Sequence, residues 1–300
     1  MIDRSSAGRR SWFRFATTMF VAIGIAASMP ALVIRAQVPA VKFDVQAARG
    51  LLVSPVYEGW YEHDGTKYAL FGYYNRNIEE IVDAPVGLDN HIAPGPADQG
   101  QPTHFFPGRH YGVFAIAVPK DPAAKELAWT VTANGQTLSI PASLDRLYFV
   151  SPQREDGGPY PGNTPPVLKF DPAGPAAQGP LGITVSRTAT VWRPLALDVW
   201  VTDDGLPPLG DGPAPALRGS PGGRLKGLAL IWREYRGSGA VSFSNPSPAV
   251  EQGKARTTVT FSRSGEYMLH LLAIDSRSGT KCCWTNGYVR VAVAPDLSGR

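Results

Sequence analysis

The sequence predicts an all-β protein with two immunoglobulin-like β-sandwich domains behind an N-terminal export segment. Three observations lead to this prediction. Of the 300 residues, 32 are glycine and 28 are proline, and these two are the poorest helix formers. Short segments alternate between apolar and polar residues, which is the period of a half-buried strand. Turn dipeptides separate those segments at short intervals, as they do in β-sandwiches.

The first 36 residues have the pattern of an export signal. Four arginines precede an uncharged, mostly apolar run from Phe15 to Ile34, and Ala36 lies before the polar Gln37. This order predicts a secretory signal with cleavage after Ala36, and therefore a periplasmic or extracellular protein. Two alternatives stay open. Residues 15–34 are long enough to be retained as a membrane anchor, and Arg9-Arg10 resembles the twin-arginine signal of proteins exported in the folded state.

Cleavage after residue 36 would change the charge balance. The full chain has a formal net charge of +4, from 29 basic and 25 acidic residues. Residues 1–36 hold five of the basic residues and one of the acidic residues, so 24 of each sign remain. A neutral chain has no general attraction to nucleic acid, which we exclude as a partner. We expect a membrane partner only if residues 15–34 stay attached.

Residues 37–150 are expected to form the first sandwich. His63-Asp64-Gly65 predicts a hairpin between Val56–Glu62 and Thr66–Tyr74, because Asp-Gly fits the tight turns that join antiparallel strands. Ala133-Asn134-Gly135 predicts a second hairpin between its two flanking segments. The other strands expected in this domain are Ile78–Val86, Thr103–Phe106, Tyr111–Val118 as a central strand, Leu127–Thr132, Gln136–Ile140 and Leu147–Val150.

Residues 151–182 form a Pro/Gly-rich linker that has room for one short strand, near Val167–Phe170. Residues 183–300 are expected to form the second sandwich. A loop at 205–227, rich in glycine and proline, separates its first two strands. The strands expected there are Leu195–Thr202, Leu228–Tyr235, Thr257–Phe261, Tyr267–Ile274 and Tyr288–Val293.

Two stretches resemble known groups of proteins. The segment TVTFSRSGEYMLHLLAIDS, followed by YVRVAV, resembles the last strands of PKD-type and other immunoglobulin-like domains of exported bacterial proteins. In the first domain, EGWYEHDGTKYALFGYYNRN and PGPADQGQPTHFFPGRH resemble uncharacterised exported bacterial proteins. These resemblances imply a β-sandwich fold and export, and they imply no activity.

Histidines are concentrated in the first domain. His104 and His110 lie six residues apart, near Asp89 and Asp98, and loops at one end of a sandwich could bring them together. Converging imidazoles with a carboxylate would suit a transition metal, and would support a metal-dependent or carbohydrate-active enzyme. The alternative is that they are polar loop residues bonded to the backbone. The common hydrolase, zinc-protease and nucleotide-binding motifs are absent, which favours a protein without catalytic activity.

Acidic residues follow two strands of the second domain. Asp203 and Asp204 come after Leu195–Thr202, and Asp275 comes after Tyr267–Ile274. Calcium prefers several carboxylate oxygens, so this trio is a candidate calcium site. The alternative is an ordinary Asp-Asp-Gly turn that ends a strand.

Cys282 and Cys283 are the only cysteines. In an oxidising compartment they could join as a vicinal disulfide; free thiols and pairing between chains are the alternatives. Because Asn286-Gly287 predicts a turn, we expect the pair in an exposed loop.

Together these patterns favour an exported cell-envelope protein that binds a protein or glycan partner. An accessory subunit of a larger envelope assembly is the alternative. We expect the partner to bind loops at the sandwich ends, at 75–77, 91–110 and 281–286, and exposed aromatic side chains. No cofactor is expected unless calcium or a transition metal binds. The candidate binding residues are Trp60, Tyr61, Arg76, His104, Arg109, His110 and Trp284.

Overall fold

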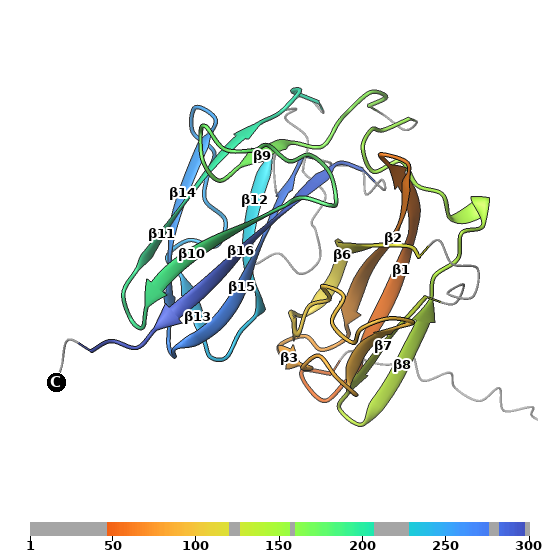
Figure 1. Cartoon of the computed structure of the whole chain (residues 1–300), viewed down its shortest axis with the longest axis horizontal. Helices are drawn as coiled ribbons and strands as arrows, with labels where there is room; N and C mark the ends of the chain where they lie inside the picture. Colours follow the sequence, from red (N-terminus) through yellow and green to blue (C-terminus); the bar gives the residue numbers. More distant parts are fainter. Residues whose placement is uncertain (1–46, 120–126, 157–159, 207–227, 276–281, 298–300) are drawn as a thin grey trace, which may run out of the picture. The chain divides into compact units, whose positions relative to one another are not determined.

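The computed structural model describes residues 47–119, 127–156, 160–206, 228–275 and 282–297 (Figure 1). Within these ranges the regular structure is strand, apart from a short 3-10 helix, η2 (Arg146–Tyr148). The prediction of an all-β fold is therefore confirmed. None of the helical structure found in these ranges is long and apolar enough to cross a membrane. The predicted export signal and most of the predicted loop at 205–227 lie outside the described residues.

The first half contains two three-stranded sheets, with strand orders β1-β2-β6 and β4-β7-β8. A small sheet of β3 and β5 accompanies them. The two larger sheets share a core in which the rings of Phe71, Phe114 and Trp129 are in contact. The strands are β1 (Val53–His63), β2 (Thr66–Asn75), β3 (Val82–Asp83), β4 (Asn90–Ala93), β5 (His104–Phe105), β6 (Gly108–Ala117), β7 (Ala128–Ala133) and β8 (Gln136–Pro141).

Both predicted hairpins are present. β1 pairs antiparallel with β2 around Asp64 and Gly65, and β7 pairs antiparallel with β8 around Asn134 and Gly135. All four turn residues have a positive φ, from 48° to 73°. Asp, Asn and Gly tolerate this left-handed conformation, and it matches the twist of the flanking strands.

The second half is a sandwich of two four-stranded sheets, with orders β10-β16-β15-β12 and β13-β14-β11-β9 (Figure 1). Their facing side chains form one apolar core that includes Val199 and Val259 from one sheet and Leu269, Leu271 and Val291 from the other. The strands are β9 (Val167–Lys169), β10 (Ile183–Thr190), β11 (Leu195–Thr202), β12 (Ala229–Arg236), β13 (Val241–Phe243), β14 (Lys254–Phe261), β15 (Gly265–Ile274) and β16 (Trp284–Ala294).

Several predicted strands differ from the structure. Ile78–Val86 contains only the two residues of β3, because the backbone N–H groups of Ile78 and Glu79 donate to the 47–48 segment. Half of Leu147–Val150 falls in η2, whose first turn is capped by the Asp145 side chain. The segment expected to form a central strand is β6, which lies at the edge of its sheet. β4, β10 and β13 were not predicted.

The free edge of β6 is covered by side chains of β16. Trp284 Nε1 and Asn286 Nδ2 both donate to the Gly112 carbonyl, over 3.1 and 2.8 Å. The Tyr288 hydroxyl donates to the Val113 carbonyl over 2.7 Å. Two backbone acceptors that another strand would normally bind are therefore satisfied by the second half of the same chain.

β12 makes a second set of contacts with the first half. A register shift between Glu234 and Arg236 places Tyr235 in the first half's core, and the Thr103 N–H donates to the Tyr235 carbonyl. The Arg236 guanidinium binds both carboxylate oxygens of Asp98, at 2.8 and 2.9 Å. The bulge thus redirects neighbouring side chains toward the first half, as bulges commonly do. The predicted domain boundaries at 150 and 183 stay predictions.

Candidate functional site

The three predicted acidic residues of the second half lie together. Asp203 and Asp204 follow the last residue of β11, and Asp275 follows the last residue of β15. These strands belong to opposite sheets, so the trio lies where the two sheets end side by side. One carboxylate oxygen from each residue lies within 4.8 Å of the others. The structure therefore brings together side chains that are about 70 residues apart in the sequence.

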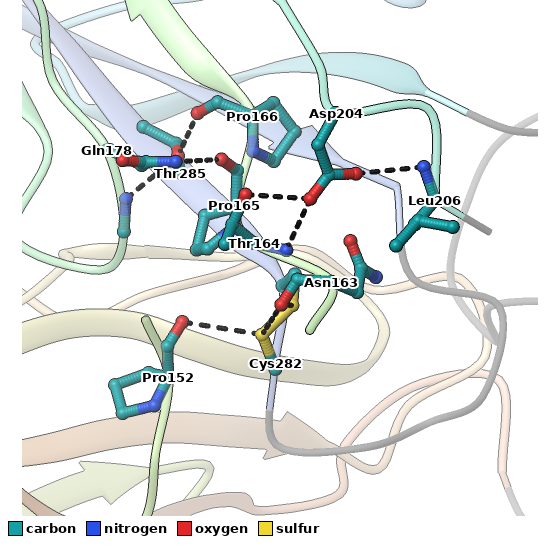
Figure 2. Close-up of a disulfide and its surroundings, with 12 residues drawn as sticks. Pro152, Asn163, Thr164, Pro165, Pro166, Gln178, Asp204, Leu206, Cys282 and Thr285 are labelled. Atoms are coloured by element: carbon teal, nitrogen blue, oxygen red, sulfur yellow. Dashed lines mark hydrogen bonds between the residues drawn. A yellow bond between two sulfur atoms is a disulfide. The ribbon is translucent and has the colours of Figure 1, made fainter. Parts of the chain in front are cut away.

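Asp204 is held in place by the segment that enters the second half. Its Oδ2 accepts hydrogen bonds from the backbone N–H and the hydroxyl of Thr164, both at 2.8 Å (Figure 2). Its Oδ1 accepts from the Leu206 N–H, also at 2.8 Å. Asp203 accepts from the Gly205 N–H. These bonds orient the two exposed carboxylates before any ligand is present.

Asp275 differs from the other two because it is buried. Its exposed fraction is 2%, and no donor group bonds its carboxylate oxygens; its side-chain hydrogen-bond partner is the Asp203 carboxyl, with which it can share a proton. Burial, together with the nearby carboxylates of Asp203 and Asp204, raises the pKa of Asp275 far above the usual range of an aspartate. Within the described ranges, no basic side chain forms an ion pair with any of the three.

Two further polar residues near this cluster were missed by sequence reasoning. Asn163 is fully buried, yet both its side-chain oxygen and its side-chain nitrogen lack a partner. Figure 2 shows its amide beside Asp204. The Glu155 N–H donates to the Asn163 carbonyl, and the Glu155 carboxylate is likewise buried without a partner. Both residues come from the predicted linker, where no periodicity or motif separates a ligand from an ordinary loop residue.

The cysteine pair lies next to the same cluster. Cys282 and Cys283 are joined by a disulfide, and both are buried (Figure 2). The Cys283 sulfur lies 3.3 Å from the Asn163 carbonyl oxygen, and the Cys282 sulfur lies 3.6 Å from that of Pro152. The expectation of an exposed loop was wrong, because Asn286 and Gly287 belong to β16 rather than to a turn.

Among the described residues, neither His104 nor His110 belongs to a group of three side chains that could hold a metal ion. His104 Nδ1 lies 2.6 Å from an Asp83 oxygen. His110 is buried, with Nε2 3.0 Å from the Pro107 carbonyl and Nδ1 2.7 Å from Arg233 Nη1. An arginine only donates, so His110 Nδ1 must accept while Nε2 donates. Both ring nitrogens of His110 are thus engaged within the protein, which leaves neither free to bind a metal in this arrangement.

The aromatic candidates are mostly buried. Tyr61 and Trp284 lie in one buried cluster with Leu70 and Val150, and Trp60 contacts the Phe149 ring edge-on. Trp284 faces β6, so it belongs to the contact between the halves. The expectation that these rings form an exposed binding face was wrong, since alternation cannot distinguish solvent from a second packed surface.

The remaining candidate binding residues, Arg109 and Arg76, are also partly enclosed by other parts of the protein. Arg109 pairs with Glu58, and its guanidinium lies 3.9 Å from the Tyr111 ring centre. Arg76 is half-buried, between Asn75 and Asn77. Those two asparagines are buried and bonded to nearby backbone, so the expected binding loop at 75–77 is part of the core.

An exposed apolar surface is found elsewhere, on and around η2. We call it the apolar ridge; its side chains are 40–88% exposed and belong to Leu144, Leu147, Tyr148 and Phe149. β1 holds this segment. Tyr57 Oη donates to the Ser143 carbonyl over 2.6 Å, and Trp60 Nε1 donates to the Asp145 carbonyl over 2.8 Å. The ridge is therefore a fixed apolar surface, and it is larger than the single exposed side chains that most surfaces carry.

Comparisons with known proteins give weak likenesses. No family model and no curated protein matches the chain. A nucleoside hydrolase-related hypothetical protein from Saccharophagus degradans, associated with carbohydrate metabolism, matches with TM-score 0.25 and 18% identity, over 45% of this chain and 26% of that one. The D00-D0 domain of intimin matches with TM-score 0.24 and 12% identity, over 80% of this chain and 100% of that one.

The Yersinia pseudotuberculosis adhesin InvE matches with TM-score 0.23 and 10% identity, over 80% of this chain and 58% of that one. This chain spans only about a quarter of the first of these three proteins. At such TM-scores, none of the likenesses carries an argument about what this chain does.

Proposed function

We propose that this chain is an exported protein of the cell envelope that binds a protein partner through the apolar ridge and has no catalytic activity. The apolar ridge is the observation that carries the proposal. Leucine, tyrosine and phenylalanine side chains placed together on a rigid turn supply the apolar centre that protein interfaces share. Their exposure to water has a free-energy cost that a partner would remove.

The chemistry of the ridge favours a protein over a glycan. Sugar rings stack on flat aromatic faces and also need polar side chains nearby for their hydroxyl groups. Here Leu144 and Leu147 stand beside the rings, and Arg146 is the charged side chain within η2. Aliphatic side chains next to aromatic rings instead suit an apolar protein surface. Two features support export: the apolar N-terminal segment of the sequence, and a disulfide, which persists in oxidising compartments.

Site-specific photo-cross-linking tests the proposal. A photoreactive residue at position 147, which is 88% exposed, is expected to give one discrete adduct in the intact envelope of the source cell. Leu147→Asp should lower the affinity of the purified partner at least about tenfold, because it places a charge in an apolar contact. Because Leu147 packs on little else, the Leu147→Asp protein should have the same melting temperature as the original chain.

Leu88 provides the matched control, since it is 93% exposed and lies outside the ridge. A photoreactive residue at position 88 should give no adduct, and Leu88→Asp should bind the partner like the original chain. Equal cross-linking from both positions, or none from position 147, would rule out the ridge as the binding surface.

A further inference from the structure

The acidic cluster of the second half has an unbalanced charge. Asp203, Asp204 and Asp275 place carboxylate oxygens within 4.8 Å of one another without an ion pair to any described basic side chain. Like charges at such distances repel, and the repulsion is stronger when one of them is buried. Bound protons or a bound cation would remove it. The arrangement alone does not distinguish these, because acidic clusters also occur without ions.

A buried acceptor outside the three carboxylates distinguishes a bound cation from bound protons. Asp275 is buried, points into the cluster and lies within hydrogen-bond reach of the Asp203 carboxyl, so one proton could bind this pair. Asn163 is fully buried beside Asp204, and its side-chain oxygen is unpaired. A buried acceptor without a partner has a free-energy cost that native structures rarely accept. A proton shared by two aspartates leaves the Asn163 oxygen unpaired, whereas a cation at the cluster can bind that oxygen as well.

The donor atoms identify the class of cation. All of them are carboxylate or amide oxygens, which are the ligands of hard cations, whereas zinc and copper prefer nitrogen and sulfur. Calcium takes roughly six to eight oxygens in variable geometry, and carboxylates that bind through one or both oxygens can supply most of these. Magnesium demands a regular octahedron and retains its waters, so irregular loops suit it less.

We propose that Asp203, Asp204 and Asp275 bind a calcium ion, with the side-chain oxygen of Asn163 as a further ligand. Such an ion would join three segments of chain. β11 supplies Asp203 and Asp204, β15 in the opposite sheet supplies Asp275, and the segment that enters the second half supplies Asn163. The hydrogen bonds from Thr164 to Asp204 already fix the position of that segment.

Calorimetric titration with CaCl2 alone, after the purified chain has been cleared of metal, tests the proposal. We expect one calcium ion per chain, with a dissociation constant of roughly 0.1–1 mM, as in other extracellular modules. At about tenfold excess over that constant, the melting temperature should rise by about 3–5 °C relative to protein in EDTA.

Asp275→Asn and Asp203→Asn should each abolish both the binding heat and the shift in melting temperature. Asn163→Ala should weaken binding by about tenfold, since it removes one ligand. In EDTA, Asp275→Asn should melt no lower than the original chain, because it replaces a buried carboxyl by a neutral group of the same shape. That result separates loss of binding from loss of folding.

Asp64→Asn is the matched control, since Asp64 is an exposed aspartate in the first hairpin, and it should bind calcium like the original chain. Absence of calcium binding in the original chain would overturn the proposal. Binding that persists in both Asp275→Asn and Asp203→Asn, or equal affinity for MgCl2, would overturn it as well.

Discussion

His270 makes the stability of the second half depend on pH. This side chain is buried, and its Nε2 lies 2.9 Å from the Asn286 Oδ1. Asn286 donates through its nitrogen to two carbonyls, so its oxygen accepts and the imidazole donates. Burial lowers the pKa of His270 to about 4, from a usual value of 6.5. The folded protein therefore holds the neutral imidazole.

We predict that the free energy of unfolding falls as pH is lowered from about 6.5 toward 4. Above this window His270 is neutral in both states. Within it the unfolded chain binds a proton that the folded chain does not, which favours unfolding. The total loss is about 3 kcal/mol, at 1.36 kcal/mol per pKa unit. Urea unfolding at several pH values measures it.

Other groups also titrate in this range, so the informative quantity is a difference between proteins. His270→Gln retains a donor to Asn286 without an ionisable ring, and it should flatten the pH profile by about 3 kcal/mol. His63→Gln, at the half-buried end of β1, should leave the profile unchanged. If the profiles of the original chain and His270→Gln have the same slope, His270 is not the source.

For single residues, the sequence predicts which side chains lie close together better than it predicts which side chains are exposed to solvent. Asp203, Asp204 and Asp275 could be grouped because each follows a strand, and strands of one sandwich end at common edges. Trp284 and His110 were expected at a binding surface because an aromatic or polar residue near a loop often lies there. Their surroundings depend on a second packed surface, and no local pattern in the sequence encodes that contact.

At the scale of strands and turns, an element could be predicted where a short run of residues specifies it. Asp64-Gly65 and Asn134-Gly135 adopt a conformation that few other residues tolerate, so both hairpins could be placed. β10 was missed because its parallel partner, β16, lies about 100 residues later in the chain. Pairing over such a distance leaves no turn signal, and the strand's Ser and Thr residues look like those of a loop.

The edge of β6 supports a prediction about Gly112. This residue has φ +53°, and a Cβ atom there would overlap the Trp284 indole. We predict that Gly112→Ala lowers the free energy of unfolding by about 2–4 kcal/mol, from backbone strain and overpacking together. Urea unfolding followed by circular dichroism measures the loss.

Gly135→Ala separates the two causes. Gly135 has φ +73°, and a Cβ there would meet nothing within 4 Å, so only the strain of about 1–2 kcal/mol remains. If the two alanine variants lose the same stability, the Trp284 indole does not pack tightly against Gly112 of β6.

At the scale of the whole molecule, the contacts between the halves predict cooperative unfolding. The strands of both halves belong to one compact unit, and Tyr235 of β12 lies in the first half's core. We predict that both halves unfold at the same urea concentration, because either half alone would expose buried aromatic rings and unpaired carbonyls.

Pulsed hydrogen exchange along a urea series measures this directly. Peptides from β2 and β15, which lie in different halves, should lose protection at the same midpoint. Arg236→Ala removes the pairing with Asp98 and should lower both midpoints together. Midpoints that differ in the original chain would show two independently folding domains, which is the division that the sequence predicts.

The parallel pairing of β10 with β16 has a mechanical consequence. Eight residue pairs, from Ile183 opposite Gly287 to Thr190 opposite Ala294, join the two strands. The chain enters this pair at the start of β10 and leaves it at the end of β16, which are opposite ends of a parallel ladder. Tension between these points loads the hydrogen bonds in shear, so they must break together rather than one after another. The parallel pairing of β10 with β16 therefore makes the second half resistant to mechanical unfolding by tension along the chain.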